Sequence, residues 1–254
     1  MTGFSAEWLA LRAPADDAAR DPGLITRLTD WAGNRPIKIA DLGGGSGAAY
    51  RALSSVLPKA SWRILDDDPA LLALISKDAE AVQTNLAAST DAAFNPKPDL
   101  LTAFAFIDLV SEAWLIKLAD SIAENGAAIY APLTYDGVEI WRPTPPNEDE
   151  ALTAFNADMR RDKGFGPALG ADAAPRLAQL LEQRGYDVST AQSPWRLQKG
   201  PLLTALAEGS ASAISAKLTP EKLATWAAGR LAATTAEIGH IDLLALPRSR
   251  IAHG

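Results

Sequence analysis

Short apolar runs alternate along the chain with stretches in which apolar residues recur every three or four positions. The runs predict buried strands and the periodic stretches predict helices, because side chains alternate between the faces of a strand and repeat every 3.6 residues on a helix. The expected strands in the first half are 37–42, 61–66, 79–86, 99–108 and 126–133, and the expected helices between them are 48–57, 69–79 and 111–126. This alternation predicts an α/β fold with a parallel sheet covered by helices on both faces.

The two flanks of this alternating region have different patterns. Residues 5–33 have the helical pattern, and we expect Pro14 and the pair Pro22–Gly23 to divide them into short helices. The second half is less regular, with expected helices at 148–161, 174–185, 200–216 and 219–235 and expected strands from about 186 to 195 and from 237 to 247. We expect one domain over 1–254, with an N-terminal helical cap (1–35), a binding core (36–133) and two insertions, 134–170 and 197–236.

A glycine-rich turn, DLGGGSG at residues 41–47, follows the first expected strand. Such a turn loses about 1 kcal/mol of stability per glycine, so we expect it to let a ligand approach the backbone closely. As Gly43-x-Gly45-x-x-Ala48 it fits the dinucleotide fingerprint, in which a pyrophosphate lies at a helix N-terminus. A second interpretation starts from the acid at position 41, and a third is a structural turn without a ligand.

With the acid included, Asp41-x-Gly43-x-Gly45-x-Gly47 resembles the first motif of the class I S-adenosylmethionine-dependent methyltransferases. A carboxylate there would repel a pyrophosphate and attract the cationic groups of S-adenosylmethionine by roughly several kcal/mol in a partly dry site. The resemblance covers about 37–133 and, by the order of elements, 172–247. It implies this cofactor and a doubly wound, seven-stranded, mostly parallel sheet with an antiparallel seventh strand, N-terminal helices and helical insertions.

The resemblance also assigns cofactor contacts outside the glycine turn. Asp66, counted back from Pro69, matches the acid that accepts hydrogen bonds from the ribose hydroxyls. Asp67 is a further candidate, although it and Asp68 also suit solvated or helix-capping positions. Asn85 stands where the family usually has an acid that accepts from the adenine amino group, and its amide oxygen can replace that acid.

The complete set of expected cofactor contacts includes two aromatic residues and one arginine. Phe106 suits the core equally well, and Arg12 would reach the carboxylate of the methionine part from the N-terminal helices. The set is Asp41, Gly43, Gly44, Gly45, Gly47, Asp66, Asp67, Asn85, Leu86, Phe104, Phe106 and Arg12.

Candidate catalytic residues follow from the topology that the resemblance implies. An antiparallel seventh strand between the fifth and the sixth would bring Glu237 and His240 close to 133–136 at the edge where ligands bind. Histidine titrates near neutral pH and is the usual base when an acceptor must lose a proton. His240, Tyr135 and Asp136 are therefore the expected catalytic residues. The alternatives are a structural histidine hydrogen-bonded to Asp242 and a turn formed by Tyr135 and Asp136.

A basic cluster lies at the end of the helix expected over 148–161. Arg160, Arg161 and Lys163 suit an anionic acceptor, or else a solvated helix end whose charge Asp158 and Asp162 balance. The two histidines of the chain are His240 and His253, and the latter stands in the C-terminal tail.

Composition narrows the function classes. The 254 residues have a net charge of −7, which disfavours a nucleic-acid partner, and contain no cysteine, which excludes disulfides and thiolate metal sites. Without a signal-peptide pattern or 18 consecutive apolar residues, the protein is expected to be cytoplasmic and off the membrane. The segments 155–170 and 193–197 resemble those of a bacterial group of methyltransferase-like proteins, which implies a bacterial-type protein.

We expect a methyltransferase that acts on an O or N atom of a small-molecule acceptor, without a metal, and a homodimer is compatible with the sequence. Two alternatives remain open. One is a protein of the same fold that binds S-adenosylmethionine without turnover, and the other is an NAD-dependent reductase.

Overall fold

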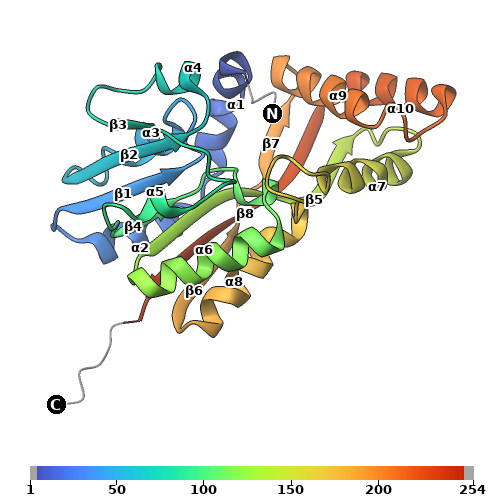
Figure 1. Cartoon of the computed structure of the whole chain (residues 1–254). Helices are drawn as coiled ribbons and strands as arrows, with labels where there is room; N and C mark the ends of the chain where they lie inside the picture. Colours follow the sequence, from blue (N-terminus) through green and yellow to red (C-terminus); the bar gives the residue numbers. More distant parts are fainter. Residues whose placement is uncertain (1–4, 249–254) are drawn as a thin grey trace.

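The computed structural model describes residues 5–248, so that His253 lies outside the described residues. A central sheet has the strand order β3-β2-β1-β4-β5-β8-β6, and β7 pairs with β8 beside this path (Figure 1). The strands are β1 (Ile37–Leu42), β2 (Ala60–Asp66), β3 (Glu80–Gln83), β4 (Leu100–Thr102), β5 (Ala128–Arg142), β6 (Tyr186–Gln192), β7 (Trp195–Gln198) and β8 (Thr235–Pro247).

The pairing confirms the predicted α/β architecture. Strands β1 to β5 pair in parallel, and β8 lies antiparallel between β5 and β6. The sheet has eight strands rather than seven, because the strand expected from 186 to 195 is interrupted. Ser193 turns its hydroxyl to the Asp242 carboxylate (2.5 Å), and Pro194 has no N–H to donate to a strand partner.

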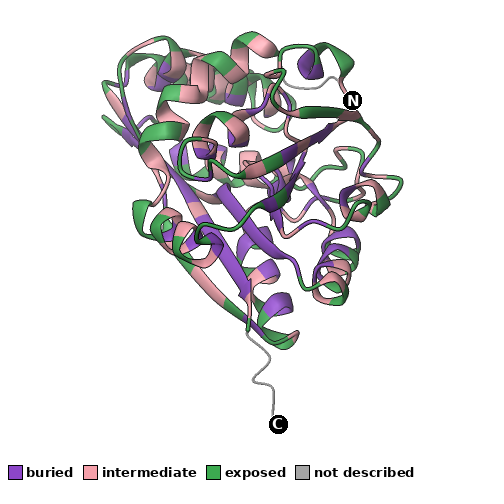
Figure 2. Cartoon of the chain, turned by 90° about the vertical axis from the view of Figure 1, so that its left-hand side faces the viewer, coloured by how far each residue is buried: buried purple, intermediate pink, exposed green. Residues whose placement is uncertain are grey.

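Helices cover both faces of the sheet, which explains the continuous apolar runs of its strands. On one face, α2 (Pro22–Ala32) and α3 (Ala48–Leu53) pack on side chains such as Ile39. On the other face, α6 (Glu112–Asn125) and α8 (Ala173–Gln183) pack on side chains such as Ala40. Figure 2 shows the buried strands inside and the exposed outer sides of the helices.

Helix ends follow local sequence signals. The Ser111 hydroxyl accepts from Trp114 N (3.3 Å) at the start of α6, and Gly126 ends this helix with a φ of 63°. The expected break at Pro14 is wrong, since α1 (Ala6–Ala19) continues through it. Two expected helices are shorter than their patterns, namely α3 and α4 (Pro69–Leu72), and a further short helix is α5 (Asp91–Phe94).

Strand β4 is also shorter than the apolar run 99–108. The chain leaves the sheet after Thr102, and residues 107–109 form a 3₁₀ turn, η1 (Ile107–Leu109). Ala105 has a φ of 46°, a left-handed conformation far from the extended backbone of a regular strand. The apolar run therefore continues as a buried loop at the carboxyl edge of the sheet.

A helical extension lies beyond one end of the sheet, where β5 and β8 continue as a long antiparallel pair (Figure 1). Residues 134–142, expected to begin an insertion, belong to β5 because they pair with 235–241 of β8. The extension contains α7 (Glu148–Met159), α9 (Pro201–Ala213) and α10 (Pro220–Ala232), and a second 3₁₀ turn, η2 (Gly170–Asp172), leads into α8.

Buried ion pairs link α10 to β5 and α7 within the extension. The Arg230 guanidinium, 1% exposed, pairs with Glu139 (2.7 Å) and Glu148 (2.5 Å) and lies between the rings of Trp141 and Trp226.

Within residues 5–248, no helix is long and apolar enough to cross a membrane.

Candidate functional site

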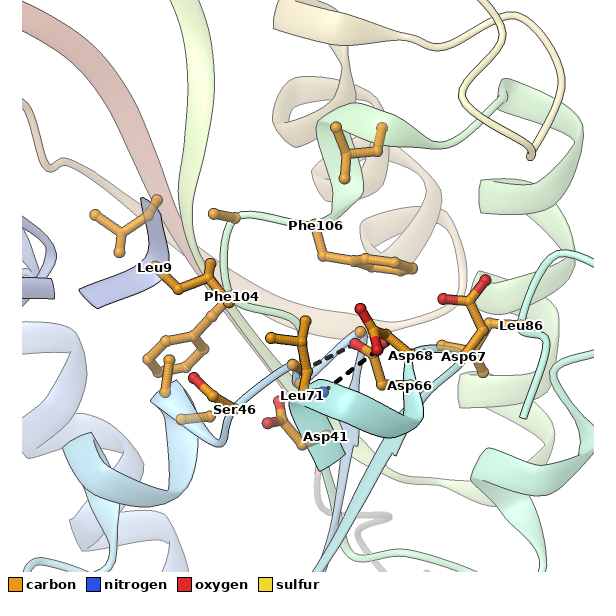
Figure 3. Close-up of a pocket in the computed structure, with 18 of the residues that line it drawn as sticks. Leu9, Asp41, Ser46, Asp66, Asp67, Asp68, Leu71, Leu86, Phe104 and Phe106 are labelled. Atoms are coloured by element: carbon orange, nitrogen blue, oxygen red, sulfur yellow. Dashed lines mark hydrogen bonds between the residues drawn. The ribbon is translucent and has the colours of Figure 1, made fainter. Parts of the chain in front are cut away.

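A cavity of about 430 Å³ opens at the carboxyl ends of β1, β2 and β4. Every residue expected to contact the cofactor lines it except Gly47, which instead precedes α3 as its N-cap with a φ of 85°. Figure 3 shows Leu9 and Phe104 on one side of this cavity and the acids that follow β2, with Phe106, on the other. Parallel strands thus bring together residues far apart in the sequence, as expected for an open α/β sheet.

The glycine turn is shaped by close contacts with the protein's own side chains. A Cβ at Gly43 would lie 2.4 Å from the Phe106 ring, and a Cβ at Gly44 would lie 2.4 Å from Asp41 Oδ2. Gly43 and Gly45 also have φ values of 60° and 52°, which favour glycine. Glycine is therefore required here to seat Phe106 and Asp41 against the backbone, whatever ligand the cavity takes.

Asp41 is fully buried at the end of β1 and lines the cavity. Its Oδ1 accepts from the Thr102 hydroxyl (2.7 Å), whereas its Oδ2 has no hydrogen-bond partner in the described part of the chain. Burial raises the pKa of Asp41 to about 7, and the nearby Asp66 carboxylate contributes to the increase. A buried carboxylate oxygen without a donor is suited to a ligand that brings positive charge or an N–H group.

The acids at the end of β2 have different roles. Asp66 is half-buried, and it accepts from Gly45 N (2.9 Å) with Oδ2 and from Asp68 N (3.0 Å) with Oδ1. Burial raises the pKa of Asp66. Asp68 caps α4 by accepting from Ala70 N (2.8 Å), in agreement with its predicted capping role, and Asp67 is exposed at the cavity wall.

Asn85 lines the cavity, but its amide oxygen is already used by a turn. Its Oδ1 accepts from Ala87 N (2.9 Å) and Ala88 N (3.3 Å). The expected contact from this oxygen to an adenine amino group would compete with these two bonds. The neighbouring Leu86 is buried, and its carbonyl accepts from Trp114 Nε1 (2.8 Å).

An aromatic cluster closes the wall beside Leu86. The rings of Phe106, Trp114 and Phe165 pack edge to face, with centroids 5.4 to 5.7 Å apart. Phe106 therefore belongs both to the core and to the cavity lining. Phe165, which comes from the segment after α7, is a cavity residue that was not predicted from the sequence. Its position between two glycines, Gly164 and Gly166, was the available signal for a loop that carries a buried side chain.

Helix α1 supplies the opposite wall, and Arg12 is held there by Asp16 and Trp195. Its guanidinium binds Asp16 through Nε (2.9 Å) and Nη2 (3.1 Å) and lies 5.0 Å from the centroid of the Trp195 ring. Trp195 Nε1 in turn donates to Asp16 Oδ1 (3.0 Å). Arg20, also not predicted from the sequence, lines the cavity and lies over the Phe104 ring.

The three expected catalytic residues lie outside the cavity lining. His240 packs against Trp195 (4.8 Å between centroids) and faces Tyr135 (6.3 Å). Burial lowers the pKa of His240 to about 3, so its ring stays neutral near pH 7. The Tyr135 hydroxyl lies 3.1 Å from Asn156 Oδ1, and Asp136 accepts from Val138 N (2.9 Å) at an irregularity within β5.

Asp242 is not the partner of His240. It accepts instead from Leu133 N (2.9 Å), Asp21 N (2.8 Å) and the Ser193 hydroxyl (2.5 Å). Leu133 lines the cavity with a φ of 61°, so Asp242 stabilises a strained residue of the cavity wall. Among residues 5–248, no group of three histidine or acidic side chains is arranged to hold a metal ion.

No family model matches the chain, and no curated protein sequence matches it. Solved structures do share its fold. The YcgJ protein from Bacillus subtilis is 13% identical, with a TM-score of 0.54 over 90% of this chain and 99% of that one. A cyclopropane-fatty-acyl-phospholipid synthase-like protein from Lactobacillus casei is 15% identical, with a TM-score of 0.54 over 96% and 95%. Precorrin-6y C5,15-methyltransferase from Geobacter metallireducens is 14% identical and more distant, with a TM-score of 0.47 over 91% and 94%.

Proposed function

We propose that this chain, which has the class I methyltransferase fold, binds S-adenosylmethionine and transfers its methyl group to an O or N atom of a small-molecule acceptor. The single observation that supports this most strongly is the lining of the 430 Å³ cavity. The glycine turn, Asp66 and Phe106 converge on it from three strand ends. These are the positions that the sequence motif assigns to this cofactor.

The residues that line the cavity fit the charged methionine part of the cofactor and also its polar ribose. Asp41 Oδ2 is buried without a donor, and a cationic ligand would supply the missing partner. Arg12 is fixed at the opposite wall, where it would pair with the carboxylate of the methionine part. Asp66 retains unused lone pairs at the cavity surface for the ribose hydroxyls.

Two features favour this cofactor over a nicotinamide dinucleotide. Asp41, Asp66, Asp67 and Asp68 all line the cavity, and carboxylates there oppose a bound diphosphate. In addition, Asp41 is fully buried, and the low dielectric around it strengthens its attraction to the cationic groups of S-adenosylmethionine. Bound S-adenosylmethionine supplies an electrophilic methyl group. The chain then has to position the acceptor in line with that group and exclude water.

The proposed function is tested by titration calorimetry with S-adenosylmethionine, S-adenosylhomocysteine and NADH. Binding of the first two and not of NADH supports the proposal, and binding of NADH alone contradicts it. Incubation with isotopically labelled S-adenosylmethionine and a metabolite extract, followed by mass spectrometry, then tests turnover. Cofactor binding without any methylated product would indicate a binding protein of the same fold.

A further inference from the structure

The basic cluster after α7 is divided by the structure into two paired arginines and one lysine. Arg160 pairs with Asp172 (2.6 Å), and Arg161 pairs with Asp158 (2.6 Å). Both arginine side chains are at least half exposed, although Arg161 reaches the cavity rim. Lys163 lines the same cavity and is half-buried.

Lys163 faces the cavity without a carboxylate within ion-pair distance in the described part of the chain. Its ammonium donates to the Met159 carbonyl. The surrounding loop is fixed, because Asp162 Oδ1 accepts from Gly164 N (2.7 Å) and Gly166 N (3.0 Å) and Phe165 belongs to the aromatic cluster. The chain therefore holds a half-buried cation at the cavity and leaves its charge unpaired.

A second unpaired group, Asp108, is near enough to Lys163 for their charges to interact. Asp108 is 6% exposed, it stands between the lining residues Phe106 and Leu109, and its Oδ1 has no partner within residues 5–248. Burial raises the pKa of Asp108 to about 6, while Lys163 and Arg12 act against this increase.

Conversely, burial lowers the pKa of Lys163, and Asp108 is the strongest group that raises it again. The other charged groups near Lys163 are Arg161, which lowers its pKa, and Asp158, which raises it. Asp108 thus helps to keep Lys163 protonated at the cavity.

We propose that Lys163 binds the oxygen atom that receives the methyl group, so that the acceptor is an oxygen acid, namely a phenol, an enol or a carboxylic acid. This inference rests on the proposed methyltransferase function. An ammonium group stabilises an oxyanion but would repel a protonated amine. Leu9, Phe104 and Leu133 line the same cavity, which favours an acceptor with an apolar body. Asp108 is then a positioning residue that acts through Lys163.

The reaction balances without a strong base in the cavity. The acidic O–H of the acceptor ionises, its proton passes to water, and the oxyanion pairs with the Lys163 ammonium. A lone pair of this oxygen forms the new C–O bond while the C–S bond breaks and leaves its electron pair on sulfur. The products are a methyl ether or methyl ester and S-adenosylhomocysteine. An aliphatic alcohol would not ionise under these conditions, which restricts the acceptor to acidic oxygens.

The first test measures binding without turnover. The protein saturated with S-adenosylhomocysteine is titrated with 4-nitrophenol, whose phenolate absorbs visible light. Wild-type protein should increase the phenolate fraction below the free pKa of the probe. Lys163→Met should abolish the increase, and the exposed control Lys117→Met, outside the cavity, should retain it. An absent phenolate signal in wild type, or an equal signal in wild type and Lys163→Met, would overturn the inference.

The second test identifies the methylated atom. Products formed from S-adenosylmethionine with a ¹³C-methyl group and a metabolite extract are examined by NMR, which distinguishes O-, N- and C-methyl carbons. We expect an O-methyl product whose formation falls about 100-fold in Lys163→Met, recovers partly in Lys163→Arg and is little changed in Lys117→Met, an exposed position outside the cavity. An N- or C-methyl product contradicts the inference alone. Absence of cofactor binding, or binding without product, contradicts the proposed function itself.

The variant Asp108→Asn tests whether Asp108 acts on the reaction through Lys163 or has only a structural role. Loss of the carboxylate should lower the pKa of Lys163, so the alkaline fall in kcat/KM should begin at lower pH than in wild type. Calorimetric binding of S-adenosylhomocysteine confirms that the variant is folded. An unchanged alkaline limb would remove Asp108 from the account.

Discussion

At the scale of single residues, the ends of β1 and β2 each present an aspartate to the cavity, and the two carboxylates have different hydrogen-bond donors. Asp66 accepts two backbone N–H groups, whereas Asp41 accepts one hydroxyl and leaves Oδ2 without a donor. The first arrangement fixes a carboxylate for hydrogen bonding, and the second keeps a negative charge available to a cation.

Replacement of Asp66 tests the ribose contact. Asp66→Ala should weaken binding of S-adenosylhomocysteine by about 1–3 kcal/mol, because a charged acceptor for two hydroxyls is lost. Titration calorimetry gives the affinity, and Asp91→Ala, at an exposed position outside the cavity, is the control. Equal affinities of wild type and Asp66→Ala would assign the ribose to another residue.

The pKa of Asp41, about 7 in the ligand-free protein, predicts a pH-dependent affinity. A cationic ligand binds the ionised form, so affinity for S-adenosylmethionine should fall by up to about tenfold per pH unit as the pH decreases below 7. Calorimetry between pH 5.5 and 8 should show this slope in wild type and lose it in Asp41→Asn. A wild-type affinity that does not change with pH would speak against a charge interaction at this position.

The same carboxyl group affects the stability of the ligand-free protein in the opposite direction. Its pKa is raised from 3.8 in the unfolded chain to about 7, so the folded state binds the proton more tightly. Its contribution to stability is fully present below pH 3.8 and is lost as the pH rises through 7. Urea unfolding should therefore show a smaller decrease in stability between pH 4 and 7 in Asp41→Asn than in wild type.

At the scale of elements, α1 and β7 together position Arg12 at the cavity. The Trp195 ring lies under the guanidinium, and its N–H binds the Asp16 carboxylate that Arg12 also binds. Arg12→Met should weaken cofactor binding by about 1–3 kcal/mol, and Trp195→Phe, which keeps a ring but loses the N–H, by about 1 kcal/mol. Arg35→Met, outside the cavity, should bind normally in the same calorimetric assay. A normal affinity in Arg12→Met would leave the cofactor carboxylate with another partner.

The helical extension depends on the buried Arg230. Arg230→Met leaves Glu139 and Glu148 buried without a counter-charge and should destabilise the protein by about 3–5 kcal/mol in urea unfolding. The exposed pair of Lys222 and Glu150 offers a control, and Lys222→Met should change stability by at most about 1 kcal/mol. A loss below 1 kcal/mol in Arg230→Met would show that the aromatic packing around it is sufficient.

Local sequence signals predicted most elements of the sheet core. The run 37–42 coincides with β1, and Ser111 and Gly126 mark the ends of α6, because strand alternation and helix caps are local properties. The extension of β5 to Arg142 was not predictable in this way. Residues 134–142 are half polar, and they form a strand because β8, about a hundred residues later, provides their partners.

At the scale of the whole molecule, the sequence motif located one half of the cavity and left the other half undefined. Asp41, Asp66 and Phe106 follow strands of one parallel sheet, so their proximity follows from the fold class. Phe165 and Lys163 reach the cavity through a loop whose course depends on long-range packing with Trp114. His240 is the reverse case. Its position beside Tyr135 was predicted, but Trp195 separates it from Arg12 at the cavity wall.

The measurement that tests the central claim most directly is a crystal structure of the protein with S-adenosylmethionine. The account predicts the cofactor in the cavity beside the glycine turn, with its ribose hydroxyls at hydrogen-bond distance from Asp66 and its adenine between Leu86 and Phe106. An empty cavity at saturating cofactor, or a diphosphate bound against residues 41–47, would contradict it.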